Sequence, residues 1–247
     1  MYAATVDGQR LTWEVAAVWR RNMIIRDRET GSLWQHATGE ALAGPLAGRT
    51  LTPLPASQVT WGVWRQEQPE TRVVASVPWA SHAPKALVEF ALRNATRDGL
   101  NAPGLHRNDA RLPSHTPIAG LVVAGEARAY PLEMVRNAGL VNDELGGRPV
   151  ALVYDGAGDR VCAFDRRVEG RVVRLRLADA HLAEESGPGR WRVDGASLDG
   201  NAPSLVCLPL SRQRWLGWSE FHPGGEVATS PAPPTGRWPG RAWGKGR

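Results

Sequence analysis

An internal repeat constrains this 247-residue chain more than any other feature of its sequence. Residues 51–73 match residues 205–227 at one constant offset, 205 − 51 = 154, and two tryptophans and two prolines keep it. Repetition at a fixed spacing is typical of duplicated structural units. The sequence therefore predicts tandem modules. The matched pairs are Leu51/Leu205, Leu54/Leu208, Pro55/Pro209, Ser57/Ser211, Trp61/Trp215, Trp64/Trp218, Pro69/Pro223 and Val73/Val227.

The match continues toward the N-terminus, but the two copies begin at different points. Trp34 matches Trp191, residues 39–44 match residues 195–200, and residues 6–8 match residues 168–170. In the second copy, recognisable sequence starts about fifty residues before this last landmark, near Ile118, whereas in the first copy the landmark lies almost at Met1. We therefore expect the first module to be incomplete.

These boundaries predict four segments. Residues 1–80 form the C-terminal half of the first module, and residues 118–228 form the second module, which is degenerate. Residues 81–117 are a helical connector with a helix over 84–96. Residues 229–247, rich in Pro, Gly and basic side chains, are expected to be a disordered tail.

Turn residues and alternating apolar residues predict a mainly β (α+β) fold, with tandem antiparallel modules and a few short helices. A Gly-bearing turn between two apolar runs indicates a hairpin, and a proline followed eight residues later by a glycine brackets a short helix. We expect hairpins over 118–132 and 149–165, a helix over 131–139 and a strand over 170–177.

Charge and composition exclude several classes of function. The formal net charge is +5, but residues 229–247 carry four basic residues and no acidic one, so the body carries only 5 − 4 = +1 and no nucleic-acid partner is expected for it. No apolar run approaches the roughly 18 residues that span a membrane, and the N-terminus carries no targeting signal. No cofactor motif and no metal-ligand spacing occurs, so neither a cofactor nor a metal is expected.

The cysteines and tryptophans could either pack in the core or form a binding or reactive site. Cys162 and Cys207 lie in apolar strings, which favours buried structural thiols over a disulfide or metal site. The chain has 11 tryptophans against 3 Phe and 3 Tyr. Indole rings could line a groove for a sugar or another flat ligand. Because the repeated tryptophans also occur in the degenerate copy, core packing is favoured for all six: Trp34, Trp61, Trp64, Trp191, Trp215 and Trp218.

Four stretches, residues 23–64, 125–135, 141–154 and 164–171, resemble a bacterial and archaeal family known as domain of unknown function 3179. In that family a module runs from a GEARAYPL-like hairpin through His-x-x-Val-Asn-Asp and Tyr-Cys-Pro-x-Cys to DRETGSLW and a TWxxW end. Some members carry two modules, and in some a selenocysteine version replaces the Cys-x-x-Cys element. The resemblance covers about 200 residues.

The departures from the family pattern are unequal between the copies. In the second copy both cysteine positions are empty within residues 154–158, Ala138 replaces the family's His, and Asn142 and Asp143 remain. In the first copy the cysteine element would precede Met1. The resemblance thus implies a truncated reading of a longer protein, interrupted at an in-frame selenocysteine codon. Family members often look exported, which implies an extracytoplasmic location.

Two functions follow. The first is a fragment of a two-module thiol or selenol redox protein whose reactive segment lies upstream, since such chemistry requires a low-pKa nucleophile. The alternative is a non-enzymatic module that binds a small polar ligand or glycan; the sequence leaves open whether the chain is an enzyme. The candidate site residues are Asp27, Arg28, Glu29, Trp34, Gln35, His36 and Thr38, with Asn142 and Asp143 as weaker candidates.

Structural alternatives stand beside these roles. Residues 27–30 could form an ion-paired turn that fixes the strand leading to Trp34, and Asn142 with Asp143 could form a hairpin turn ahead of two glycines. If the first module lacks strands, we expect an exposed apolar sheet edge beside Leu11, Ile24 and Ile25, and poor solubility.

Overall fold

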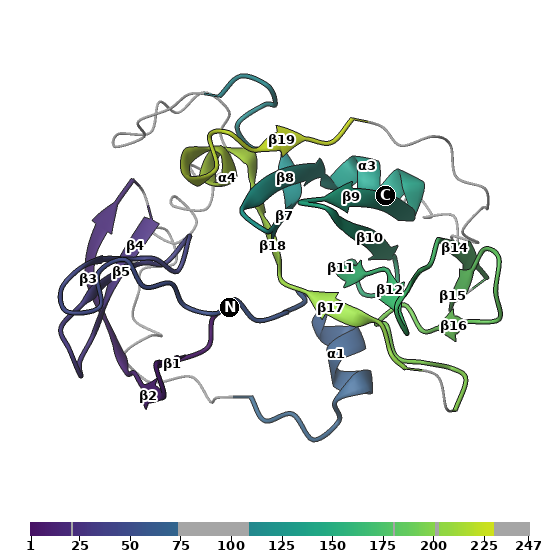
Figure 1. The fold of residues 1–247 in the computed structure, drawn as a ribbon, viewed down its shortest axis with the longest axis horizontal. Coiled ribbons are helices and arrows are strands. Elements are labelled where there is room, and N and C mark those ends of the chain that lie inside the picture. The colour runs from purple at the N-terminus through teal and green to yellow at the C-terminus, as the bar shows by residue number, and fades with distance from the viewer. Residues whose placement is uncertain (21, 74–108, 180, 201–202, 230–247) are drawn as a thin grey trace, which may run out of the picture.

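The computed structural model describes residues 1–20, 22–73, 109–179, 181–200 and 203–229. Over these residues the fold is mainly β, with several antiparallel sheets and three short helices, and the N-terminus lies between two groups of sheets (Figure 1). The fold class predicted from the sequence is therefore confirmed. No helix in this described part is long and apolar enough to cross a membrane.

The N-terminal half forms a small hairpin, a four-stranded antiparallel sheet and one helix. Its elements are β1 (Thr5–Val6), β2 (Gln9–Arg10), β3 (Trp13–Trp19), β4 (Asn22–Asp27), β5 (Leu33–Gln35), β6 (Ala41–Ala43) and α1 (Trp61–Glu67). Asp7 and Gly8 turn the β1–β2 hairpin with φ of 48° and 82°, as a two-residue turn with both φ positive requires. The sheet, in the order β3-β4-β5-β6, packs on a core around Leu11, Trp34 and Leu51.

The C-terminal half is larger and contains most of the sheets. Its elements are β7 (Pro117–Val123), β8 (Glu126–Pro131), α3 (Leu132–Ala138), β9 (Leu140–Leu145), β10 (Arg148–Asp155), β11 (Arg160–Asp165), β12 (Arg167–Val168), β13 (Arg171–Val172), β14 (Leu175–Ala178), β15 (His181–Glu184), β16 (Arg190–Trp191), β17 (Val206–Leu208), β18 (Leu210–Arg214), α4 (Trp215–Phe221) and β19 (Glu226–Val227). Two four-stranded sheets, β18-β7-β8-β19 and β17-β11-β10-β9, are joined by a three-stranded sheet β14-β15-β16 and the hairpin β12-β13.

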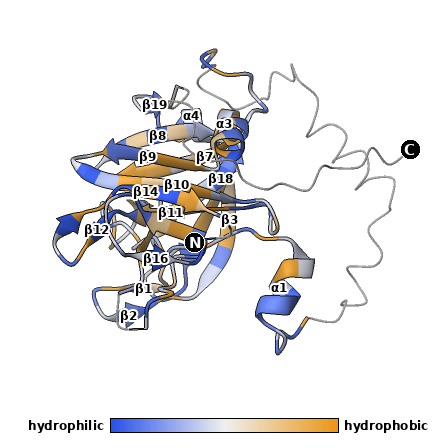
Figure 2. Ribbon diagram, turned by 90° about the vertical axis from the view of Figure 1, so that its right-hand side faces the viewer, coloured by the Kyte–Doolittle hydropathy of each residue, from blue (hydrophilic) through white to orange (hydrophobic). Residues whose placement is uncertain are grey.

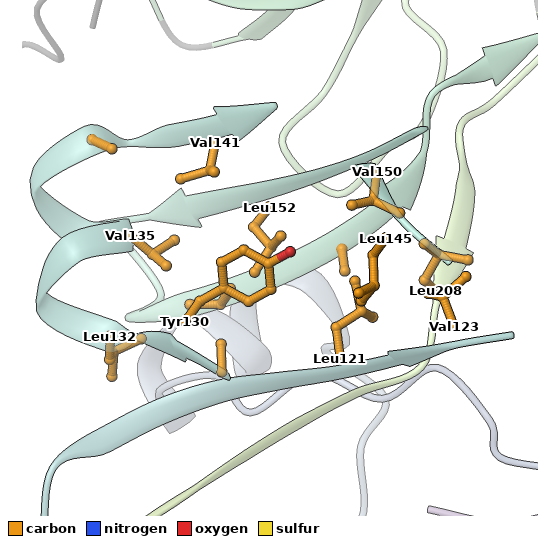
Figure 3. Packing of buried hydrophobic residues seen from close by; sticks show 14 residues of the cluster. Leu121, Val123, Tyr130, Leu132, Val135, Val141, Leu145, Val150, Leu152 and Leu208 are labelled. Atoms are coloured by element: carbon orange, nitrogen blue, oxygen red, sulfur yellow. The ribbon is translucent and has the colours of Figure 1, made fainter. Parts of the chain in front are cut away.

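The main core lies between these two four-stranded sheets and the helix α3. Figure 3 shows the Tyr130 ring at its centre, with Leu121, Leu145 and Leu152 around it. Apolar residues concentrate in the sheets around β7, β9 and β10, whereas α1 stands to one side of the sheets (Figure 2). The C-terminal half therefore carries the largest core cluster, beside a second one around Phe164 and Trp191, whereas α1 buries none of its residues.

Local signals in the sequence predicted several of these elements. The hairpins expected over 118–132 and 149–165 are β7–β8 and β10–β11, and the first of them turns at Ala124 and Gly125 with φ of 49° and 84°. The helix expected over 131–139 is α3, which ends at Gly139 with φ of 70°. These predictions are confirmed. Glycine at positive φ is a common end for a helix because it has no Cβ to clash.

Two local predictions are wrong. The strand expected over 170–177 is divided into β13 and β14, because the backbone N–H of Val173 donates to Arg166 O at 2.8 Å and turns the chain from one hairpin into the next sheet. Asn142 and Asp143 lie within β9 and form no turn. The turn is made after the end of β9 by Gly146 and Gly147, at φ of 56° and 66°.

The predicted connector and tail are largely not described. The helix expected over 84–96, residues 81–108 of the predicted connector, and residues 230–247 of the predicted tail lie outside the described residues. The boundaries 1–80, 81–117, 118–228 and 229–247 therefore stay predictions.

The two halves share detailed geometry at positions matched by sequence. The bridge between Tyr2 and Pro53 corresponds to the pair Phe164 and Cys207, at the offsets 162 and 154 of the sequence match. In each half a glycine at positive φ faces the ring of that first aromatic residue: a Cβ on Gly39 would lie 2.7 Å from Tyr2, and a Cβ on Gly195 would lie 2.5 Å from Phe164.

Hydrogen bonds and helices repeat as well. Leu51 N donates to Gly39 O at 2.9 Å, and Leu205 N donates to Gly195 O at 2.9 Å. The helices α1 and α4 each span seven residues and begin at matched tryptophans, 215 − 61 = 154. These correspondences support the interpretation that the chain contains a duplicated unit.

The prediction that all six repeated tryptophans pack in the core is wrong for two of them. Trp34, Trp191, Trp215 and Trp218 are at most 2% exposed, whereas Trp61 is 51% and Trp64 39% exposed. Trp215 and Trp218 pack against Ile118 of β7 and Ala129 of β8. Among the described residues, α1 has no such hairpin beneath it, and its matched tryptophans therefore stay open to solvent.

Of two expectations about exposure, the one about the cysteines is corrected and the one about an exposed sheet edge is confirmed. Cys162 is half-buried and Cys207 is exposed, so the prediction of two buried thiols is wrong for Cys207, which lies on the short edge strand β17. The predicted apolar edge does lie beside Ile24 and Ile25, although these residues do not form it: Leu11 and Ile24 are at most 5% exposed, and Ile25 packs against the same small core. The exposed edge strand is β3, which pairs Val15 with Ile25 and exposes Val15, Val18 and Trp19; the opposite edge strand β6 exposes Leu42.

Candidate functional site

Asp27, at the end of β4, is buried and organises the turn into β5. Its carboxylate accepts hydrogen bonds from Trp34 Nε1 at 2.8 Å and from Thr30 Oγ1 at 3.0 Å, and also from the Thr30 backbone N–H. Burial alone would raise the pKa of Asp27, but these hydrogen bonds outweigh it and hold the pKa below its ordinary value. The Asp27 carboxylate is therefore ionised, and its hydrogen bonds are made within the protein.

Arg28 and Glu29 are exposed and lie on the β3 side of the same turn. Glu29 accepts hydrogen bonds from the backbone N–H and the hydroxyl of Thr12, at 2.8 and 2.7 Å, which lower the pKa of Glu29. Arg28 lies 3.6 Å from the Glu14 carboxylate. These contacts support the structural interpretation of residues 27–30 as a turn that fixes the sheet.

Trp34 and Gln35 belong to the interior of the N-terminal half. Trp34 is fully buried and meets Trp13 edge to face, with ring centroids 5.8 Å apart. Gln35 is 2% exposed; its Oε1 accepts from the Ala37 backbone N–H at 3.1 Å, and its Nε2 has no partner among the described residues. Both side chains support the loop that follows them.

That loop brings His36 and Thr38 to a cavity of about 420 Å³ between the two halves. Its position near the N-terminus follows from the hydrogen bond between Tyr2 OH and Ala37 O, at 2.8 Å, which ties the loop to the first residues of the chain. Asn22, at the start of β4, lies on the same wall. The volume is within the usual range of roughly 300–1,000 Å³ for small-molecule sites.

The opposite wall comes from the C-terminal half. Ser211 and Gln213 of β18 line the cavity together with Trp218 and His222 from the end of α4. The rings of Trp218 and His222 are in contact at a tilt, with centroids 4.0 Å apart and planes 37° apart. Gly120 of β7 allows the indole to lie flat on the sheet, because a Cβ there would be 2.2 Å from Trp218 Cζ3.

Two buried polar atoms on the cavity walls are unsatisfied. Among the fully buried indoles, Trp34 donates to Asp27, Trp191 to Pro203 O and Trp215 to Asp109 O. Trp218 Nε1, in a side chain only 2% exposed, has no acceptor within the described residues, and Asn22 Oδ1 has no donor there. An unsatisfied buried donor costs about 1–3 kcal/mol, so an acceptor reaching Trp218 from the cavity would be favoured.

The cavity has little charge. No Asp, Glu, Lys or Arg side chain is among the described residues that line it. Burial lowers the pKa of His222 from its ordinary value of 6.5, so that its imidazole is neutral at pH 7. The walls carry hydroxyl, amide, imidazole and indole groups among apolar side chains, a surface suited to an uncharged molecule that has both polar and apolar faces.

The weaker candidates Asn142 and Asp143 form cross-links within the C-terminal half. The Asn142 amide donates to Leu175 O at 2.8 Å and accepts from Leu175 N at 3.0 Å, joining β9 to β14. Asp143 accepts from Arg128 Nη1 at 2.7 Å and from Tyr130 OH at 2.8 Å. Burial raises the pKa of Tyr130, whereas the two donors hold the pKa of Asp143 below its ordinary value despite burial.

The cysteines show no activated thiol, and no cluster of three potential metal ligands occurs among the described residues. Burial raises the pKa of the Cys162 and Cys207 thiols, which disfavours the thiolate. In the part of the chain that the structure describes, no three His, Cys, Asp or Glu side chains gather in a way that could hold a metal ion.

Of the residues singled out from the sequence, the structure therefore brings only His36 and Thr38 to the cavity. Sequence reasoning did not nominate Asn22, Gln213 or His222, because nothing in their local pattern distinguishes them. Trp218 and Ser211 carried a signal, since both belong to the matched pairs of the repeat. That signal favoured core packing for Trp218 and did not indicate its position at a cavity.

Comparison with known proteins gives one match. A family described as "Protein of unknown function (DUF3179)" matches residues 1–225. No curated protein and no solved structure matches the chain.

Proposed function

We propose that this chain, which belongs to the DUF3179 family, binds a small uncharged polar molecule in the cavity between its two β-rich halves. The observation that carries the proposal is that Trp218 lines the cavity while its buried Nε1 has no acceptor within the described residues. Natural proteins satisfy nearly all buried polar groups, and an exception at a concave surface is a common feature of a binding site.

The wall chemistry defines what the ligand must offer. It needs an acceptor, such as a carbonyl or hydroxyl oxygen, for Trp218 Nε1 and a donor, such as a hydroxyl or amide, for Asn22 Oδ1. Apolar contacts with Leu54, Val122 and Leu210 would pack its remaining surface. A sugar, a sugar alcohol or a small amide meets these requirements, and a multiply charged ligand does not.

The test is a binding screen on the full chain. Uncharged monosaccharides, sugar alcohols and small amides are added, and binding is detected as a rise in melting temperature and quantified by calorimetry. Trp218→Phe removes the indole donor and keeps an aromatic ring. Because one hydrogen bond is worth about 1–1.5 kcal/mol, we expect this variant to bind about tenfold more weakly.

Trp19→Phe is the matched control, since Trp19 is 43% exposed on β3 and does not line the cavity. It should bind as the unchanged chain does. If no compound of these classes binds, or if Trp218→Phe binds as tightly as the control, the proposal is wrong.

The thiol or selenol chemistry implied by the family resemblance stays a prediction about sequence upstream of Met1. Within the described residues the raised thiol pKa values of Cys162 and Cys207 do not favour it. A thiol-reactivity assay across pH addresses the present chain: slow alkylation of both cysteines at pH 7 is expected, and rapid alkylation of either would contradict the structural role of these two thiols.

A further inference from the structure

The two cysteines of the chain, 207 − 162 = 45 residues apart in the sequence, lie on one face of one sheet. Cys162 belongs to β11 and Cys207 to the neighbouring edge strand β17 (Figure 1). Cys207 pairs with Phe164 in the register of these strands, and Phe164 is two residues from Cys162. Residues opposite one another, and residues two apart on a strand, point to the same face of a sheet. The two thiols therefore point to the same side.

The packing of the neighbouring side chains supports this arrangement. Cys162 packs against the core cluster that contains Phe164, whereas Leu208 belongs to the largest core cluster. Because successive residues of a strand face opposite sides, Cys207 points away from the cluster of Leu208 and toward the side of Cys162. The two thiols also interact electrostatically: burial is the main cause of the raised pKa of Cys162, and Cys207 adds to it.

The offset between the cysteines decides which kind of bridge could join them. Residues placed diagonally across an antiparallel pair of strands are about 7–8 Å apart at their Cα atoms. A disulfide requires Cα atoms within about 7 Å, so a disulfide here would displace a strand. A metal ion between two sulfur atoms spans a longer gap than a sulfur–sulfur bond does. The geometry therefore suits a bridging ion better than a disulfide.

From this geometry we propose that Cys162 and Cys207 bind one Cu(I) ion between them. Thiolates are soft ligands, which favour Cu(I) and Zn(II). A structural zinc site needs four ligands. Among the described residues, no third His, Cys, Asp or Glu side chain gathers with the two cysteines. Cu(I) is stable with two thiolates in a linear arrangement, so the pair is sufficient for this ion.

Binding replaces two protons by one ion. In the metal-free chain, burial raises the pKa of both thiols, so both stay protonated at pH 7. Cu(I) displaces both protons and keeps its oxidation state, and the product is a bis-thiolate complex with one negative charge. The Arg160 guanidinium, which favours the Cys162 thiolate, offsets part of this charge. Cys207 is exposed, which gives the ion a path from solvent.

The experiment titrates the full, reduced chain with Cu(I), without oxygen, in competition with the coloured Cu(I) chelator bicinchoninate. We expect the protein to withdraw one Cu(I) per chain from the chelator. Cys162→Ser and Cys207→Ser should each bind Cu(I) at least about 100-fold more weakly, because losing even an outer partner of a metal ligand costs about 10–100-fold. X-ray absorption of the loaded chain should show two sulfur neighbours of copper.

Ser57→Ala is the matched control, because the Ser57 hydroxyl lies 3.7 Å from Cys162 Sγ and its removal leaves both thiols in place. It should bind Cu(I) as the unchanged chain does, and unchanged melting temperatures of the metal-free variants show that they fold. The proposal is overturned if the unchanged chain withdraws no Cu(I), if either cysteine substitution leaves the affinity unchanged, or if one ion is bound per two chains. A disulfide that forms with oxidised glutathione in a chain that binds no Cu(I) would also overturn it.

Discussion

At the scale of single residues, buried polar groups separate structural from binding roles. Asp27 and Trp34 satisfy one another, and Asp27 has additional donors from Thr30. Trp218 is equally buried but its Nε1 has no partner within the described residues. Both tryptophans belong to matched pairs of the repeat, and the sequence predicted core packing for both. Trp34 is hydrogen-bonded within the core, whereas Trp218 lines the cavity and its Nε1 has no partner within the described residues.

Asp27→Ala should destabilise the chain by about 2–3 kcal/mol, because it leaves Trp34 Nε1 buried without an acceptor. Urea unfolding followed by circular dichroism measures the change. Arg28→Ala, next in the chain but exposed, should shift the free energy of unfolding by no more than about 0.5 kcal/mol. Equal effects of the two substitutions would contradict a structural role for Asp27.

At the scale of elements, the contact between α4 and the β7–β8 hairpin explains why one Trp-bearing helix is buried. The hairpin offers Gly120 and Ala129, and the small residues leave room for the indoles of Trp215 and Trp218. The same contact positions Trp218 and His222 at the cavity. The packing of α4 and the shape of the candidate site are therefore coupled.

Gly120→Ala should destabilise the chain by about 1–3 kcal/mol, since the added Cβ would lie 2.2 Å from Trp218 Cζ3 and the ring must move. Thermal unfolding gives the stability, and near-ultraviolet circular dichroism reports on the indole environment. Gly224→Ala is the control, because a Cβ there meets nothing within 4 Å. A Gly120→Ala chain with unchanged stability and spectrum would show that the flat contact is not required.

At the scale of the whole molecule, the halves meet at the cavity and through few ionic links. Arg20 Nε lies 3.4 Å from Glu220 Oε1, and Glu67 pairs with Arg160. Carboxylates with lowered pKa values occur in both halves, at Asp27, Asp143 and Asp159. Each of them stabilises the folded state when ionised. The contribution is complete above the ordinary carboxylate pKa near 3.8 and is lost as pH falls through the lower folded-state pKa.

Acid should therefore reduce the free energy of unfolding below about pH 4, and Asp143→Asn should reduce the part due to this residue. The groups that face Asp143 are Arg128 and Tyr130, and Glu226 pairs with the same Arg128. Near pH 7 the Asp143→Asn variant should be about 1–3 kcal/mol less stable, because the neutral amide at position 143 cannot form the charge-assisted hydrogen bond with Arg128. Denaturant unfolding from pH 7 to pH 2 should show the difference shrinking toward low pH; a difference independent of pH would contradict this assignment.

Turns that contain glycine could be predicted from the sequence, whereas features that depend on distant residues could not. The turn at Ala124–Gly125 and the end of α3 at Gly139 each contain a glycine at positive φ, so the sequence predicts them. The break at Val173 does not follow from its alternating pattern, because it is fixed by hydrogen bonds with Arg166, which lies between β11 and β12. For the candidate site, only His36 and Thr38 were nominated, since the other wall comes from the C-terminal half, where Gln213 is 213 − 36 = 177 positions from His36.

The sequence by itself determined the mainly β class, the hairpins, the family resemblance and the matched Trp pairs, because each depends on residue types at short or constant spacing. Only the tertiary structure decided which matched indoles are buried and which polar atoms remain unsatisfied. Burial and hydrogen bonding depend on what packs against a side chain, and those neighbours come from distant segments. Trp64 and Trp218 therefore share a local sequence pattern, yet one is open to solvent and the other lines a cavity.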